Sequence, residues 1–290
     1  MSKIGLLKDE MGVTVDQKII AADSFHFLRE CQVKPFSAVL TDPPYGTRIK
    51  GMDNKEWDNG FPHPDFWREL LRHTEDDGWL VCFTAARTQH RSATALEEAG
   101  WRVEDIMAWI RPYAIGRTNG LKRGWETIIL ASKGSPRGLN TDLARVKGDG
   151  IPQWPGQDLP DNNRALNFKR GHPASRKQTR SPSSVVVAAE DAGVLNGHDR
   201  FFIVGRSPTS ERGEYNTHPS VKPVSLLEHL LLLVYRLGGM VLDPFAGSGS
   251  TLVAAKRLMI PCLGIEVDQD YCRIAQRRLD NTEEIDTKRK

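Results

Sequence analysis

Short apolar runs and longer amphipathic segments alternate along this chain. The short runs, bounded by Gly, Pro, Asp or Asn, predict buried strands at residues 18–22, 36–40, 79–84, 103–109, 125–132, 201–204, 240–242 and 262–265. The longer segments carry apolar residues at helical spacing and predict helices at 24–31, 64–74, 88–99, 225–237, 250–258 and 270–279. Strands that alternate with helices predict a doubly wound, mostly parallel α/β sheet. Within it, the first strand–helix–strand unit predicts parallel pairing of the strands at 18–22 and 36–40.

This pattern stops between residues 134 and 198, which are rich in Gly, Pro, Asn, Ser and Arg and hold one apolar run at 185–189. No acidic residue occurs from 162 to 187, but six basic residues do: Arg164, Lys169, Arg170, Arg176, Lys177 and Arg180. Clustered basic side chains neutralise phosphates and release counterions, so one interpretation is an inserted segment that contacts DNA. A solvated loop explains the same composition.

Two polar strings follow predicted strands. The first is Asp42-Pro43-Pro44-Tyr45-Gly46, and the second is Asp243-Pro244-Phe245-Ala246-Gly247-Ser248-Gly249-Ser250-Thr251. In an open α/β sheet, ligands bind at the carboxyl ends of the strands. We therefore expect the two strings to lie at one edge of the sheet and to form a single site.

The chemistry of the first string suits a planar amine. Two consecutive prolines hold the backbone extended, so that one carbonyl can be presented rigidly. An exocyclic amine of a nucleobase is a poor nucleophile because its lone pair is delocalised into the ring. If Asp42 and the Pro43 carbonyl accept its two hydrogens, the lone pair becomes available, and Tyr45 can stack on the base. A base inside a duplex cannot reach such a loop unless it is flipped out.

The second string predicts a nucleotide-type cofactor. Gly247 and Gly249 permit close backbone approach, but the string lacks the lysine of a P-loop and the third glycine of a dinucleotide fingerprint. Glu266 ends the next predicted strand, where a carboxylate can accept both ribose hydroxyls of an adenosine. A tight turn and a structural salt bridge are the alternatives for these residues.

The two strings, in this order, resemble the β-type (permuted) S-adenosylmethionine-dependent DNA amino-methyltransferases that act on adenine N6 or cytosine N4. A third segment, His218-Pro219-Ser220-Val221-Lys222-Pro223, is similar to the His-Pro-Thr-x-Lys-Pro motif of that family, with Ser in place of Thr. Asp23 matches an acidic position near the cofactor's adenine, although it could equally be a helix N-cap. The resemblance implies cofactor-binding roles for Asp23, Ser220, Lys222, Asp243, Phe245, Gly247, Gly249 and Glu266, and catalytic roles for Asp42, Pro43, Pro44 and Tyr45.

The resemblance also implies a Rossmann-like catalytic domain (residues 1–133 and 199–290), an inserted target-recognition segment (134–198) and double-stranded DNA as the substrate. Adenine N6 is the expected target, because relatives that act on cytosine more often have Ser where this chain has Asp42. A cytosine-N4 enzyme and an inactive DNA-binding relative remain alternatives. RNA and protein-glutamine methyltransferases also use Pro-Pro-Tyr loops, but in those families the cofactor glycines normally come first.

Composition adds limits to this picture. The net charge of +3 is too small to indicate a nucleic-acid partner by itself. Four cysteines show no metal-type spacing, so we expect no metal site and reduced, mostly buried thiols in a cytosolic protein: Cys31, Cys82, Cys262 and Cys272. The resemblance implies a prokaryotic or phage-encoded protein. The richest apolar stretch, 226–237, is interrupted by charged residues, which argues against a membrane span. Homodimer formation and a partner nuclease are left open.

Overall fold

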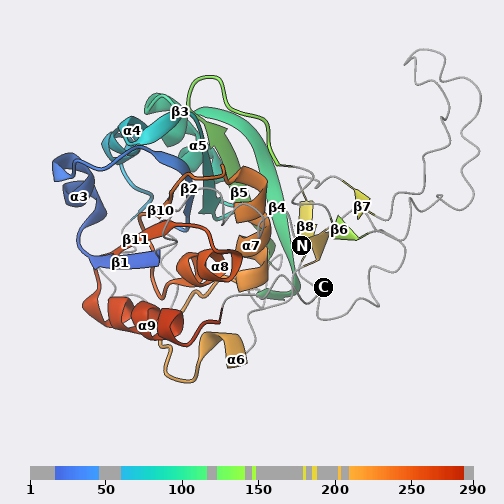
Figure 1. The fold of residues 1–290 in the computed structure, drawn as a ribbon. Coiled ribbons are helices and arrows are strands. Elements are labelled where there is room, and N and C mark those ends of the chain that lie inside the picture. Colours follow the sequence, from blue (N-terminus) through green and yellow to red (C-terminus); the bar gives the residue numbers. More distant parts are fainter. Residues whose placement is uncertain are drawn as a thin grey trace, which may run out of the picture.

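The computed structural model describes residues 17–45, 60–115, 123–140, 146–147, 179–180, 185–187, 202–203 and 209–283. Within these ranges one large mixed sheet forms the centre of the molecule (Figure 1). Its strands, in spatial order, are β1 (Gln17–Ala21), β11 (Cys262–Glu266), β10 (Val241–Asp243), β2 (Phe36–Thr41), β3 (Thr74–Thr84), β5 (Arg123–Ser132), β4 (Arg102–Ile115), β8 (Val185–Val187) and β9 (Phe202–Ile203). A separate pair is formed by β6 (Val146–Lys147) and β7 (Thr179–Arg180).

Most neighbouring strands of this sheet are parallel, as the alternating pattern predicts. The exception is β5, which runs antiparallel to both β3 and β4. One expectation is wrong: β1 and β2 do not pair with each other, because β11 and β10 lie between them. The two C-terminal strands therefore complete the sheet between strands that are close in sequence.

Helices cover both faces of the sheet, which confirms the doubly wound architecture (Figure 1). On one face, α7 (Val224–Val234) and α8 (Ser250–Leu258) pack on Leu40, Val81 and Ile128. The other face carries α3 (Ser24–Glu30), α4 (Pro64–Arg72) and α5 (Gln89–Glu98). Two further helices are α6 (Thr209–Arg212) and α9 (Gln269–Asp280), and the latter packs beside β1 and α8. Among the described residues, no helix is both long and apolar enough to span a membrane.

The first part of β3 differs from the expected helix–strand boundary. The helix predicted at 64–74 ends at Arg72, and the strand begins at Thr74, before the apolar run that starts at Trp79. Acidic residues and Gly78 interrupt the hydrophobic pattern over this part of the strand. Gly78 is required there, because a Cβ would lie 2.6 Å from the Thr74 methyl carbon.

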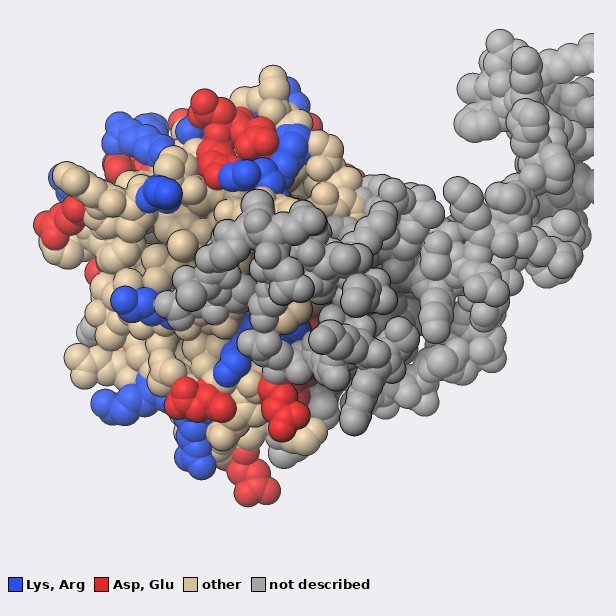
Figure 2. Space-filling model, viewed as in Figure 1, with Lys and Arg blue, Asp and Glu red and all other residues tan. Residues whose placement is uncertain are grey.

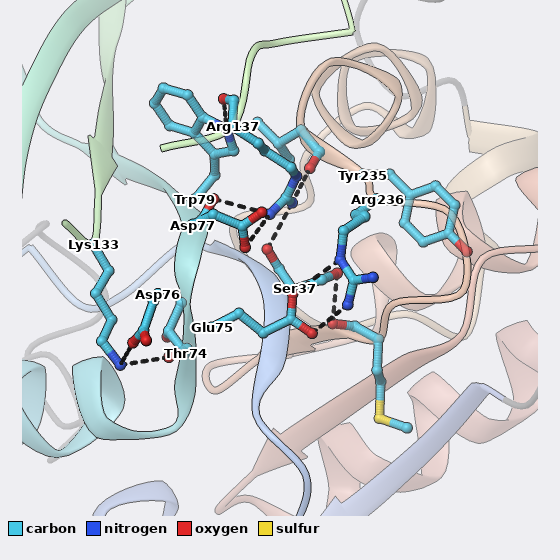
Figure 3. A network of polar contacts seen from close by, with 12 residues as sticks. Ser37, Thr74, Glu75, Asp76, Asp77, Trp79, Lys133, Arg137, Tyr235 and Arg236 are labelled. Carbon is cyan, nitrogen blue, oxygen red and sulfur yellow. Dashed lines mark hydrogen bonds and ion pairs between the residues drawn. The ribbon is translucent and has the colours of Figure 1, made fainter. Parts of the chain in front are cut away.

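Residues 133–140 are tied to the edge of the sheet where the parallel strands begin (Figure 3). The Arg137 guanidinium donates to the main-chain oxygens of Ser37 at 2.7 Å, Val234 at 2.7 Å and Asp77 at 3.0 Å. Lys133 bonds to the Thr74 carbonyl at 2.8 Å on the same edge. The start of the segment assigned to 134–198 is thus joined to the main sheet, and β8 lies beside β4 in the same sheet. The boundaries of that segment stay a prediction.

Candidate active site

The carboxyl ends of four parallel strands meet at one edge of the sheet. The register pairs Ala21 with Glu266 and Asp243 with Gly264, and it aligns Leu242 with Val39 three residues before Asp42. Asp42, Asp243, Glu266 and Asp23, which lie far apart in the sequence, therefore come to the same edge. This is the arrangement that the two polar strings predict.

The Asp42 carboxylate is held on both of its oxygens. The Tyr45 hydroxyl donates to Oδ1, and the Lys222 ammonium donates to Oδ2. Burial, followed by the negative charge of Asp42, raises the pKa of Tyr45 well above its ordinary value, so the phenol remains a donor. The Tyr45 hydroxyl thus donates its hydrogen to Asp42, and the Tyr45 ring lies 5.7 Å from the Lys222 nitrogen.

Lys222 lies at the catalytic loop. Its side chain is only 6% exposed, and its nitrogen lies 3.3 Å from Ser220 Oγ and 3.7 Å from Glu126 Oε2, in addition to its contact with Asp42. The sequence analysis assigned Lys222 to cofactor binding, for which the methionine carboxylate is the natural partner of a cation, and did not single out Glu126. The signal for Glu126 is an acidic residue in the otherwise apolar strand β5.

The glycine loop needs its glycines for its own conformation. Gly247 has φ +51° and Gly249 has φ +78°, in the left-handed region that other residues avoid. A Cβ at Gly247 would lie 2.8 Å from His218 Nε2, and one at Gly249 would lie 2.8 Å from the Ala275 Cβ. Both glycines are buried. The loop is thus packed tightly between two neighbouring elements.

Asp243 lies at the base of this loop and is 3% exposed. Burial raises the pKa of Asp243 to about 7, although hydrogen bonds from Thr251 and from the Phe245 backbone oppose the shift. The Phe245 N–H donates to Asp243 Oδ1 at 3.1 Å. The Phe245 ring lies 5.1 Å from that of Phe66, so its side chain fixes the loop to α4.

Glu266 closes the loop from the neighbouring strand. Its two carboxylate oxygens accept the backbone N–H groups of Gly247 at 2.8 Å and Asp268 at 2.9 Å. Burial raises the pKa of Glu266. Asp23 accepts from the His26 N–H at 2.8 Å and is the N-cap of α3, as one of its two interpretations predicts.

Two residues that the sequence analysis did not single out, Arg278 and Asn216, form hydrogen bonds with the glycine loop. The Arg278 guanidinium, 4% exposed, donates to the Ser248 carbonyl at 2.8 Å and to Ser250 Oγ at 2.9 Å. Asn216 donates to Ser248 Oγ at 3.2 Å. Burial lowers the pKa of His218 to about 4, so the imidazole under Gly247 is neutral. These contacts join residues that are far apart in the sequence, so no local motif predicts them.

The basic cluster expected to contact DNA falls outside this geometry. Arg164, Lys169, Arg170, Arg176 and Lys177 lie outside the described residues, and only the backbone of Arg180 is described, in β7. On the described surface in Figure 2, acidic and basic side chains are intermixed. Within the described ranges, no group of three or more His, Cys, Asp or Glu side chains could hold a metal ion. Cys82, Cys262 and Cys272 are buried and Cys31 is partly so, all as free thiols.

Comparison with known proteins gives consistent relatives. The N6_N4_Mtase family, described as DNA methylase, matches residues 36–277. The chain is 25% identical over 274 residues to the type II methyltransferase M.HpaI of Haemophilus parainfluenzae, which covers 92% of this chain and 75% of that protein. It is also 43% identical to the DNA adenine methyltransferase YhdJ of Escherichia coli K12, over 70 residues that make up 23% of each chain.

Solved structures show the same fold. The complex of M1.HpyAVI with SAM superposes with a TM-score of 0.58 and 21% identity, covering 91% of this chain and 100% of that one. The cytosine-N4-specific PvuII DNA methyltransferase superposes with a TM-score of 0.58 and 16% identity, covering 92% and 88%.

Proposed function

Because the chain belongs to the N6/N4 family of DNA methylases, we propose that it methylates adenine N6 in double-stranded DNA, with Asp42 acting on the target amine. Its cofactor is S-adenosylmethionine, and its substrate is DNA. The single observation that carries the proposal is the convergence of the Asp42 loop and the glycine loop at one edge of the sheet. An acceptor for an amine and a cradle for a nucleoside cofactor are thereby brought together.

The described residues fit the cofactor. A carboxylate has about four acceptor positions, and Glu266 uses one on each oxygen for a backbone N–H. The remaining positions suit the two ribose hydroxyls. Asp23 lies after β1, the strand beside β11, where it can border the adenine. Gly247, Gly249, Asp243 and Phe245 would shape the loop around the nucleoside, and the exposed Ser220 would border the methionine end.

In the proposed reaction, the Asp42 loop accepts hydrogen bonds and a proton from the target amine. When bound, the cofactor supplies an electrophilic methyl group on a positively charged sulfur. Asp42 and the Pro43 carbonyl would accept the hydrogens of the flipped base's amine, which makes its lone pair available for attack on the methyl carbon. The carbon–sulfur bond would break as the new bond forms, with its electron pair left on the sulfur. Asp42 would also accept the proton that the amine loses. Positioned general bases contribute on the order of 10²–10⁴-fold in rate.

Two observations favour adenine over cytosine. Asp42 provides a full carboxylate at the first position of the Pro-Pro-Tyr string. The stretch with 43% identity belongs to a relative named as a DNA adenine methyltransferase. The fold does not favour adenine, because the PvuII enzyme, which is named as cytosine-N4-specific, superposes with a TM-score of 0.58. Cytosine N4 is therefore the second candidate.

Methyl transfer from labelled S-adenosylmethionine to unmodified DNA, followed by digestion to nucleosides, tests the proposal. We expect N6-methyladenine from the wild-type protein. In Asp42→Ala we expect a rate lower by on the order of 10²-fold or more, with cofactor affinity retained. N4-methylcytosine as the only product would reverse the base assignment. Cofactor binding without transfer to any DNA would instead favour an inactive DNA-binding relative.

A further inference from the structure

Lys222 is a buried cation whose contacts do not match a cofactor ligand. It precedes α7, and its side chain is 6% exposed. An ammonium group has three N–H donors, and three side-chain oxygens lie within 3.7 Å of it, one each on Asp42, Ser220 and Glu126. The aromatic ring of Phe83 lies 5.2 Å away. The oxygens on Asp42 and Ser220 accept hydrogen bonds from the ammonium, and the Glu126 carboxylate lies close enough to pair with its charge. The contacts of Lys222 therefore point to the catalytic loop rather than to a cofactor carboxylate.

We propose that Lys222 is a positioning residue for the methyl-transfer reaction, which holds Asp42 in its reactive orientation and charge state, with Glu126 as the counter-charge. The inference rests on the proposed function, because it assigns Asp42 to the target amine. It moves Lys222 from the cofactor site to the catalytic loop. It also gives a role to Glu126, which no sequence motif includes.

The first part of this role is geometric. A carboxylate attached to a flexible side chain has to be fixed if it is to accept a hydrogen from an amine at one defined position. Tyr45 holds Oδ1 and Lys222 holds Oδ2. Each oxygen keeps a second acceptor position, so the carboxylate can bind the amine without releasing either partner. A misplacement of about 1 Å can cost on the order of 10²-fold in rate.

The second part is electrostatic. Asp42 and Glu126 carry two negative charges, and Lys222 between them carries one positive charge. The group therefore keeps a net negative charge, which suits the positive sulfur of the methyl donor. Without Lys222, two carboxylates would face each other in a poorly solvated site, and like charges in such a site favour uptake of a proton. Among the described residues, the titratable groups that contact Asp42 or interact with it electrostatically are Lys222, Tyr45, Cys82, His218 and Asp243, and Glu126 lies across Lys222 from it.

The test uses Lys222→Met in the full chain, because methionine keeps much of the side-chain volume and removes the charge. We expect kcat to fall by on the order of 10²-fold, while calorimetry shows an unchanged Kd for S-adenosylmethionine. The rising limb of the pH–rate profile should also move to higher pH. The control is Lys133→Met, which removes a partly buried lysine that pairs with the exposed Asp76 at the opposite edge of the sheet and should change none of these quantities.

Glu126→Gln provides an independent variant that retains the cation, and it serves if Lys222→Met does not fold. Removal of the counter-charge should move the rising limb to lower pH, and the double variant should lie between Lys222→Met and the wild type. A large increase in the cofactor Kd of Lys222→Met, with an unshifted pH profile, would overturn the proposal and return Lys222 to the cofactor carboxylate.

A failure of the proposed function can be distinguished from a failure of the positioning role. If the wild-type protein transfers no methyl group to DNA, that function falls, and the positioning role is then measured at the carboxyl carbon of Asp42 by ¹³C NMR. We expect this signal, identified by its disappearance in Asp42→Asn, to titrate at higher pH in Lys222→Met than in the wild type. An unchanged titration would overturn the positioning role.

Discussion

At the scale of single residues, Asp243 is a buried acid whose environment differs strongly from water. It ends β10, is 3% exposed, and accepts hydrogen bonds from the loop that we assign to the cofactor. A buried carboxyl group favours its protonated form, because the charged form loses its hydration. Asp243 therefore stabilises the loop through its hydrogen bonds, but its ionisation lowers the free energy of unfolding.

This balance predicts a pH-dependent contribution to stability that Asp243→Asn removes. The pKa of Asp243 rises from 3.8 to about 7 on folding, so the native state holds its proton more tightly than the unfolded chain. As pH increases through that window, the unfolded state releases the proton first, and the free energy of unfolding falls by at most about 1.4 kcal/mol per pH unit. Urea denaturation at several pH values should show Asp243→Asn gaining on the wild type as pH increases. Parallel stability curves would contradict this assignment.

At the scale of elements, Arg137 connects three parts of the fold that are distant in sequence. Its guanidinium bonds to main-chain oxygens at the start of β2, within β3 and at the end of α7 (Figure 3). The Arg137 carbonyl in turn accepts from the Trp79 indole N–H at 3.0 Å. Residues 133–140 form neither a helix nor a strand. The contacts of Arg137 instead fix them to the sheet.

We expect Arg137→Met to destabilise the protein by about 1.5–3 kcal/mol, because main-chain acceptors with little access to water lose a charged donor. Urea denaturation of the full chain measures this decrease. The matched control is Arg236→Met in the same network: Arg236 pairs with Glu75 on the surface and is 43% exposed. Such exposed pairs contribute about 1 kcal/mol or less. Equal decreases in the two variants would show that Arg137 holds the segment no more firmly than a surface ion pair does.

Elements with strong hydrophobic periodicity were predictable, and those defined by long-range contacts were not. The helix predicted at 250–258 has the bounds of α8, because Gly249 and an apolar face mark it locally. The start of β3 was missed because its residues are acidic and its pairing partner is Phe36, far along the chain. Lys222 follows the same rule: its motif was recognised, but its contact with Asp42 spans 180 positions.

At the scale of the whole molecule, the sheet order explains why the site exists. β10 and β11 come from the C-terminal part of the chain and lie between β1 and β2. Hydrophobic patterning predicts that these strands are parallel and buried. The pairing that it predicted between the strands at 18–22 and 36–40 is wrong, because neighbours in the sheet are set by long-range contacts. The order of the two polar strings, together with the rule that ligands bind at strand carboxyl ends, was enough to predict that they meet. It was insufficient to predict which side chains touch.

The assignment of DNA binding to the basic segment is also a whole-molecule prediction. Replacing Lys169, Arg170, Arg176 and Lys177 by Ala should weaken duplex binding and reduce the slope of log affinity against log salt by about 0.9 for each phosphate that the protein no longer neutralises. The control removes equal charge from exposed side chains of the catalytic fold: Arg29, Arg72, Arg102 and Arg236 to Ala. Binding isotherms at several salt concentrations compare the two sets. If both flatten the slope equally, net charge alone explains the effect; if only the first set does, the segment binds phosphates. An unaltered slope in the first set would make the segment a solvated loop.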